Sequence, residues 1–270
     1  MKLSIVSNLK ETKRTQEKII RDFSELCKLL KPLGYDGIEL SLLEPEKIDI
    51  KKINEIKDSY NFEIPAIGTG STYIRFGYSL GHQNEQIRNN AIKRMQKYIE
   101  FARETESRVI IGLIRGRYKY GSNSKKERLN IISSLKECCW IAQNNKVELV
   151  FEPINQFEID SFNTISQSLE LLKEIDSDNL KLLIDSFHTY LEEDPDFIWE
   201  DLKEIVHLVG HLHLADTNRK APGTGHFDFK TFLNIFKKKG YKGFASIETI
   251  MKPSFEIVAK KSSEYLGLII

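Results

Sequence analysis

Short apolar runs typical of strands alternate along the chain with longer, charged stretches that have a helical period. The expected helices cover about 15–31, 49–60, 84–106, 125–144, 164–176, 196–207, 229–239 and 254–266. The pair Asn163-Thr164 and the residue Asp228 are expected to provide N-caps, and Gly34 and Gly240 are expected to follow helices as C-terminal caps. The eight expected strands are Leu3–Ser7, Gly37–Leu42, Ile64–Gly68, Val109–Ile114, Val147–Glu152, Leu180–Asp185, Val209–Ala215 and Gly243–Glu248.

Eight strand–helix units in 270 residues predict an α/β fold, a (β/α)8 TIM barrel with a closed parallel sheet. No linker or low-complexity tract divides the chain, so we expect one domain over residues 1–270. A doubly wound open sheet is the alternative. That fold usually has fewer strands and favours a glycine-rich turn after the first one, where this chain has Ser7, Asn8, Leu9 and Lys10.

Composition narrows the possible partners and the compartment. Forty basic residues against 39 acidic ones give a net charge of +1, which disfavours a nucleic-acid partner. No apolar run approaches the roughly 18 residues of a membrane span, and the opening segment MKLSIVSN is too short for a secretory signal. Three cysteines, two of them adjacent, form neither a disulfide framework nor a metal-type spacing. We therefore expect a cytoplasmic protein that acts on a small molecule.

Metal-ligand residues end the last four expected strands, at Glu152, Asp185, His213 and Glu248. Buried, unpaired carboxylates are costly, so three acids and a histidine on one barrel rim indicate one bound divalent cation. An oxygen-rich set with one imidazole suits Mn²⁺, Mg²⁺ or Co²⁺ better than a structural zinc, and we expect Mn²⁺ first. His211 shares a face with His213 but lies deeper, and is expected to be a satisfied core histidine.

Further polar side chains follow these strand ends. His188 comes just after Asp185, Arg219 lies on the loop after His213, and Glu158 lies six residues beyond Glu152. Taken alone, each of these three residues is explained equally well as an ordinary polar residue of a surface loop.

Short segments in both halves of the chain carry a resemblance to known proteins. Those in the second half are Glu152-Pro-Ile-Asn155, Asp185-Ser-Phe-His188, His211-Leu-His213-Leu-Ala-Asp216, Asn218-Arg219, Pro222-Gly-Thr-Gly225 and Glu248. Those in the first half are Ala66-Ile-Gly-Thr-Gly70, Ser79-Leu-Gly-His82 and Val109–Arg117. The segments in the second half resemble the sugar phosphate isomerase/epimerase superfamily of xylose-isomerase-like barrels, and within it the ketose 3-epimerases. The segments in the first half are similar to the epimerases of keto-sugar acids, of the 5-keto-L-gluconate type.

The resemblance implies that the four strand-end residues hold the metal and that Glu152 and Glu248 also form the acid/base pair. It implies that Glu158, His188 and Arg219 hold the hydroxyls and the carbonyl of the substrate. Two departures bear on the substrate. Gln156 stands where the relatives acting on keto acids tend to carry arginine, and Thr189-Tyr190 replaces a Met-Asn pair.

The expected function is a metal-dependent epimerase that inverts the carbon next to the ketone of a ketose or keto-sugar acid (5-keto-L-gluconate or D-tagaturonate type) through a cis-enediolate. The alternatives are a neutral ketose 3-epimerase, an aldose–ketose or hydroxypyruvate-type isomerase, and a non-catalytic sugar-binding barrel. An abasic-site endonuclease is more remote, because it needs three metals and extra histidines after the third and fourth strands. We also expect a homo-oligomer, a dimer or a tetramer.

Two arginines near the expected end of the fourth strand, Arg115 and Arg117, are candidates for reading a substrate carboxylate. Side chains alternate along an extended segment, so at most one of them is expected to face the pocket. The alternative is that both pair with neighbouring loops or lie at a subunit interface.

Overall fold

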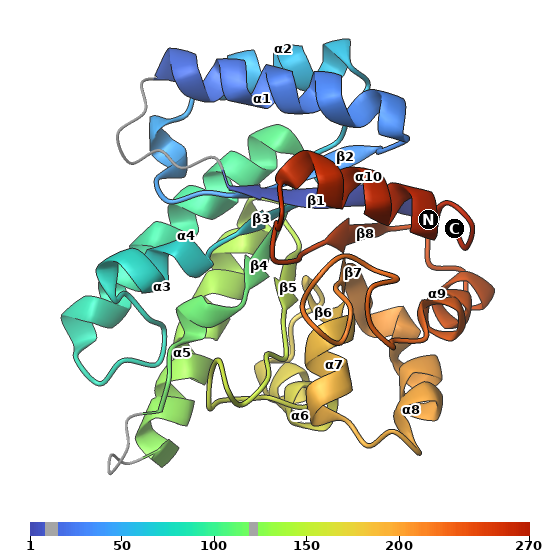
Figure 1. Ribbon diagram of the computed structural model, residues 1–270. Coiled ribbons are helices and arrows are strands. Elements are labelled where there is room, and N and C mark those ends of the chain that lie inside the picture. Colours follow the sequence, from blue (N-terminus) through green and yellow to red (C-terminus); the bar gives the residue numbers. More distant parts are fainter. Residues whose placement is uncertain (9–15, 119–123) are drawn as a thin grey trace.

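A computed structural model describes residues 1–8, 16–118 and 124–270 (Figure 1). In these ranges eight parallel strands close into a barrel in which each strand pairs with the next and β8 pairs with β1. The predicted α/β barrel is confirmed. The strands are β1 (Lys2–Asn8), β2 (Gly37–Ser41), β3 (Ala66–Gly68), β4 (Arg108–Ile111), β5 (Leu149–Phe151), β6 (Leu180–Asp185), β7 (Val209–Leu214) and β8 (Phe244–Ile247).

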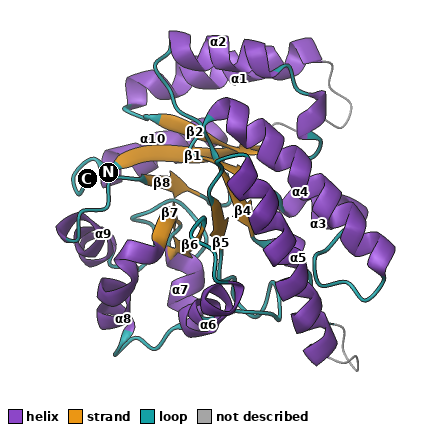
Figure 2. Cartoon of the chain, turned by 180° about the vertical axis from the view of Figure 1, so that it is seen from behind, coloured by secondary structure: helices purple, strands orange, loops and turns teal. Residues whose placement is uncertain are grey.

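Helices surround the strands, as the view from behind also shows (Figure 2). Their apolar faces cover the outside of the sheet, and the two chain ends lie close together. The helices in the described ranges are α1 (Gln16–Leu30), α2 (Ile50–Ser59), α3 (Gly70–Phe76), α4 (Glu85–Thr105), α5 (Ser124–Asn144), α6 (Ile165–Ile175), α7 (Ser186–Glu192), α8 (Ile198–Ile205), α9 (Phe229–Lys238) and α10 (Phe255–Leu266). No helix in this part of the chain is both long and apolar enough to cross a membrane.

The predicted caps are present. The side chains of Thr164 and Asp228 accept the N–H groups of Gln167 and Thr231 at the starts of α6 and α9. Gly34 and Gly240 have φ angles of +80° and +83°, which glycine adopts without a steric penalty. Position 15, the predicted start of the first helix, lies outside the described residues.

Two additional helices and one early strand end are the main differences from the prediction. The helices α3 and α7 lie in segments that were expected to be loops. The fourth strand, expected to reach Ile114, ends at Ile111, and the next residues form a 3₁₀ turn over Leu113–Arg115. This early end matters for the site because it changes the direction of Arg115.

The barrel interior has two chemically different halves. On β3 to β6 it is apolar, with Ala66, Ile110, Val150 and Leu183 packed together. On the adjoining strands β7, β8, β1 and β2 it is polar and equally buried, and its residues there include Ser4, Glu39, His211 and Ser246. The barrel axis therefore runs between a hydrocarbon wall and a polar wall.

Candidate metal centre

A cavity of about 340 Å³ opens at the carboxyl ends of the strands, where (β/α)8 enzymes bind substrates. Of the four predicted ligands, Glu152, His213 and Glu248 line the cavity, and residues of β1, β2, β3 and α3 form the opposite wall. That wall includes Val6, Ser41, Gly68, Thr69, Gly70, Ser71 and Ile74.

The ends of β5 to β8 bring the four predicted ligands together. The Nδ1 atom of His213 lies 3.4 Å from Oε1 of Glu152, 3.4 Å from Oε2 of Glu248 and 3.9 Å from Oδ2 of Asp185. The N–H groups of Glu152 and Glu248 each donate to the neighbouring strand, at 3.1 Å, so both carboxylates project from backbone that the sheet still holds.

Two atoms in this cluster are buried without a hydrogen-bond partner in the described structure: Oε1 of Glu152 and Nδ1 of His213. Buried polar atoms are almost always satisfied, so two orphans that face each other indicate a missing ligand. Nδ1 of His213 offers a lone pair when the ring carries a single proton, and carboxylate oxygens of Glu248 and Asp185 lie 3.4 and 3.9 Å from it. The carboxylates of Glu152, Asp185 and Glu248 and a ring nitrogen of His188 are also close enough to one another to hold one ion. The donor set therefore fits a divalent cation.

The charges of the cluster reinforce this interpretation. Burial would lower the pKa of His213, but the carboxylates of Glu39 and Glu248 outweigh it and raise that pKa well above its usual value. Burial would likewise raise the pKa of Glu248, but His213 and Arg219 lower it. The centre thus carries excess negative charge that favours any nearby cation.

Arg219 partly balances this charge from the loop after β7. Its guanidinium donates to Asp185 at 3.1 Å and to Glu248 at 2.9 Å, and it lies over the ring of Phe187. Burial alone would lower its pKa, but the two carboxylates raise it. Arg219 therefore stays charged beside these two carboxylates.

Asp216 fixes the loop that carries Arg219. Its carboxylate accepts the N–H groups of Thr217, Gly223 and Phe227. A Cβ atom on Gly225 would lie only 2.3 Å from the Asp216 carboxylate, so a glycine is needed there. The segment Pro222-Gly-Thr-Gly225 thus has a positioning role.

His188 lies in the first turn of α7, close to the four predicted ligands. The N–H and side-chain amide of Asn155 both point at its Nδ1, at 3.4 and 2.7 Å. Asn155 is oriented by its oxygen, which accepts the N–H groups of Phe157 and Glu158. Nδ1 of His188 is therefore an acceptor and Nε2 carries the proton, 3.9 Å from Glu152. This N–H suits a substrate oxygen better than a cation.

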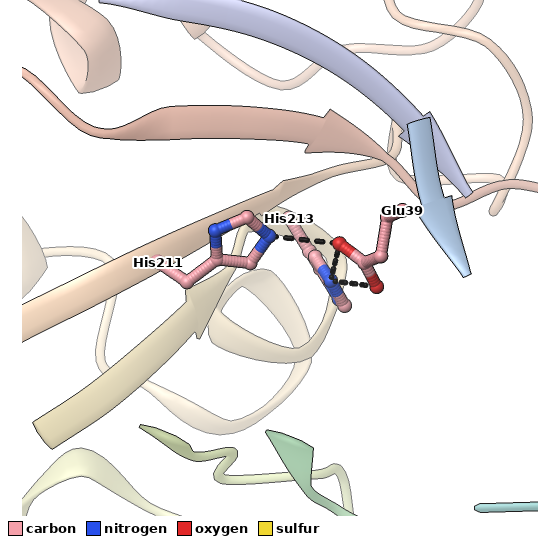
Figure 3. Close-up of side chains that lie close together, drawn as sticks. All are labelled: Glu39, His211 and His213. Atoms are coloured by element: carbon pink, nitrogen blue, oxygen red, sulfur yellow. Dashed lines mark hydrogen bonds and ion pairs between the residues drawn. The ribbon is translucent and has the colours of Figure 1, made fainter. Parts of the chain in front are cut away.

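Sequence reasoning missed Glu39. From β2 its carboxylate reaches Nε2 of both His211 and His213 (Figure 3). Burial would raise its pKa, but the two histidines lower it to about 2. A charged residue at an inward position of an apolar strand was the available signal. The expectation that His211 is a satisfied core histidine is supported at Nε2, while its Nδ1 has no hydrogen-bond partner in the described structure.

The structure does not bring Arg115 to the cavity, which corrects that expectation. Its fully buried guanidinium donates to the carbonyl oxygens of Gly112, Glu152, Ser161 and Phe162. The 3₁₀ turn that ends β4 aims the side chain under the next loop instead of into the pocket.

Arg117 is exposed and donates to the carbonyl oxygen of Glu158, while the Glu158 side chain itself lines the cavity. The positions at which the chain departs from the family pattern lie away from the cavity lining. Gln156 and Tyr190 are exposed, and Thr189 is buried in α7. None of these four residues, Arg117 included, lines the cavity in the described structure.

Comparison with known proteins agrees with the fold. Residues 27–266 match the family model described as "Xylose isomerase-like TIM barrel". The chain is 27% identical to a "Probable ketose 3-epimerase" of Synechocystis sp., over 80% of this chain and 74% of that one. It is 24% identical to the "3-dehydro-D-guloside 4-epimerase" of Escherichia coli, over 83% and 86% of the two chains. A solved D-allulose 3-epimerase from Methylomonas sp., in complex with D-allulose, superimposes with a TM-score of 0.85 at 18% identity, covering 100% of this chain and 97% of that one.

Proposed function

The chain belongs to the xylose isomerase-like TIM barrel family, and from that premise we propose that it is a metal-dependent epimerase that inverts the carbon next to the ketone of a sugar. The observation that carries the proposal is the pair of orphaned, mutually facing atoms on Glu152 and His213, with a carboxylate of Glu248 beside them. The relatives support the reaction class. Ketose 3-epimerases and a 3-keto-glucoside 4-epimerase, by their names, all act one carbon from a carbonyl.

Glu152, Asp185, His213 and Glu248 would hold the cation. When bound, it would polarise the ketone and stabilise the negative charge that develops on the oxygens of an enediolate, an effect worth several kcal/mol. We propose Mn²⁺, with Mg²⁺ and Co²⁺ as alternatives that the same donors accept.

Glu152 and Glu248 would serve as the acid/base pair. One carboxylate removes the proton from the carbon next to the ketone, and the other returns a proton to the opposite face, so the centre inverts without any redox step. The low pKa of Glu248 means that this group is ionised before the reaction, as a base must be. Arg219 and the Nε2–H of His188 would donate to substrate oxygens and keep the sugar oriented.

The cavity lining favours a neutral ketose over a keto-sugar acid. Arg219 is the one Lys or Arg side chain among the described lining residues, and two carboxylates already engage it. Hydroxyls of Ser41, Thr69 and Ser71 line the wall away from the acids. With Arg115 buried elsewhere, no free guanidinium of the described lining is available for a substrate carboxylate. An aldose–ketose isomerase would use the same groups and remains the alternative.

The test is a substrate screen with the Mn²⁺-loaded protein, run with neutral ketoses and keto-sugar acids and with product analysis by NMR in D₂O. We expect the carbon next to the ketone to invert and to gain deuterium, and a neutral ketose to give the higher kcat/KM. Glu152→Gln and Glu248→Gln should each lower kcat by at least about 10²–10⁴-fold. Full activity in either variant would exclude the acid/base pair, and transfer of hydrogen between C1 and C2 would favour the isomerase.

A further inference from the structure

A continuous chain of polar side chains links β1, β8, β7 and β2 inside the barrel, and Figure 3 draws three of its members, Glu39, His211 and His213. The hydroxyls of Ser4 and Ser246 lie 2.5 Å apart, and Ser246 lies 3.0 Å from Nε2 of His211. That same nitrogen is 2.8 Å from Glu39, whose two oxygens lie 3.0 and 3.1 Å from Nε2 of His213. All five residues are at most 1% exposed.

Such a chain is costly in a barrel interior, which is usually filled by Val, Ile and Leu. The opposite half of this barrel follows that rule, with an apolar cluster of Ala66, Ile110, Val150 and Leu183. A buried charge is tolerated only when its partners satisfy it, and Glu39 has two imidazoles for its two oxygens. Packing alone therefore does not explain why the interior is polar on β7, β8, β1 and β2.

The position of Glu39 supplies that reason. A histidine that binds a cation through one ring nitrogen usually donates its other N–H to a carboxylate, which fixes the tautomer and the ring orientation. Glu39 lies on the Nε2 side of His213, while Nδ1 faces Glu152 and Glu248 without a hydrogen bond. The two edges of one ring thus face two different sets of acids.

We infer that Glu39 is a positioning residue of the metal centre: it accepts the Nε2–H of His213 and so keeps the Nδ1 lone pair directed at the cation. His211 holds the same carboxylate from the other side and prevents it from turning away. The inference deepens the proposed function and rests on it.

Glu39, His211 and His213 are also close enough to suggest a second ion among themselves. Their distances of 2.8–3.1 Å are those of hydrogen bonds. Ligands placed tetrahedrally about 2.1 Å from a metal would be farther apart, at roughly 3.4 Å. His211, moreover, does not line the cavity in the described structure. Shared protons therefore explain the geometry, and we expect one ion per chain.

The first experiment compares cation affinity in the wild type, Glu39→Gln and the control Ser246→Ala, by competition with a chelator. The amide introduced by Glu39→Gln has one acceptor oxygen for two imidazole N–H groups, so Mn²⁺ affinity should fall by about 10–100-fold. Ser246→Ala removes a contact of His211 but leaves the Glu39–His213 pair, and should stay within about twofold of the wild type. Equal affinities of wild type and Glu39→Gln would overturn the positioning role. Two tightly bound ions per wild-type chain would overturn it as well.

The second experiment needs no variant at Glu39. In the ¹⁵N-histidine-labelled wild type loaded with diamagnetic Zn²⁺, we expect the ring proton of His213 on Nε2, slowly exchanging and shifted downfield by its bond to Glu39. A proton on Nδ1 would overturn the inference even if Glu39→Gln failed to fold. A wild type that binds no cation at all would instead refute the proposed function, so the two failures are distinguishable.

Discussion

Replacing Arg115 by methionine separates a structural role from a role in reading the substrate. The guanidinium donates to three carbonyl oxygens at 3.0 Å and to a fourth at 3.4 Å, and it lies 5.0 Å from the ring centroid of Phe151. Burial lowers its pKa to about 10, so the cation carries a desolvation cost even in the wild type. Methionine fills similar volume but donates no hydrogen bond.

The magnitude follows from these contacts. Hydrogen bonds from charged donors contribute about 1.5–3 kcal/mol each, and the three short ones set a gross loss of roughly 4–9 kcal/mol. The variant no longer buries a charge, and water can reach some of the freed carbonyl oxygens, so part of this loss is offset. We expect the free energy of unfolding to fall by about 3–5 kcal/mol, as for other buried ionic groups that lose a partner. Arg115→Lys keeps the charge but not the planar fork, and should lie between the wild type and Arg115→Met.

Urea denaturation gives the stability change, and kcat/KM measured for a keto-sugar acid and a neutral ketose gives the selectivity. We expect Arg115→Met to lower stability while the ratio of the two kcat/KM values stays within about twofold, since a lost carboxylate contact would change it by a factor of ten or more. A variant as stable as the wild type, or one that loses keto-acid activity selectively, would refute the structural assignment.

Three other substitutions test the remaining parts of the site. Asp185→Asn removes a charge but keeps an oxygen that can still cap α7. The Mn²⁺ content after dialysis should therefore fall while the circular dichroism spectrum is retained. Unchanged Mn²⁺ content would exclude Asp185 as a ligand. Gly112→Ala would place a Cβ atom 2.9 Å from Oε2 of Glu152. The Glu152 carboxylate would then have to move by about half an ångström, which should lower kcat roughly tenfold. Full activity would show that the close approach of Gly112 does not position Glu152. Arg117→Met should leave the ratio of keto-acid to neutral-ketose kcat/KM unchanged because its guanidinium lies outside the cavity lining, and a selective loss of keto-acid activity would restore its proposed carboxylate contact.

The sequence alone predicts the barrel and the gathering of Glu152, Asp185, His213 and Glu248 at its rim because both follow from periodicity. The run LKLLID reads as a strand that ends at an acid, and the structure places β6 over the same residues, Leu180–Asp185. In a closed parallel barrel all strand ends meet at one rim, so the acids and His213 had to be neighbours.

The direction of Arg115 and the partner of His213 could not be predicted in the same way. Leu113 and Ile114 are apolar, so the sequence predicts that the strand continues through them. Only the three-dimensional course of the chain after Gly112 reveals the 3₁₀ turn. Glu39 is separated from His213 by 174 residues, and no local pattern encodes so distant a hydrogen bond. The inward, alternate spacing of Ser4, Glu39, His211 and Ser246 on their strands was visible, but it acquires meaning only when the barrel closes.

The two walls of the cavity differ in what a mutation does to the enzyme. The charged groups over β5 to β8 are electrostatically coupled, so a change at one of them alters the others at once. Apart from Glu39, the described residues of the wall over β1 to β3, among them Ser41, Thr69, Ser71 and Ile74, contribute shape and hydroxyls without charge. Variation there can reshape the space around the far end of a sugar while the cation site stays as it is. Directed evolution of new sugar preferences should therefore begin at the described wall residues Ser41, Thr69, Ser71 and Ile74.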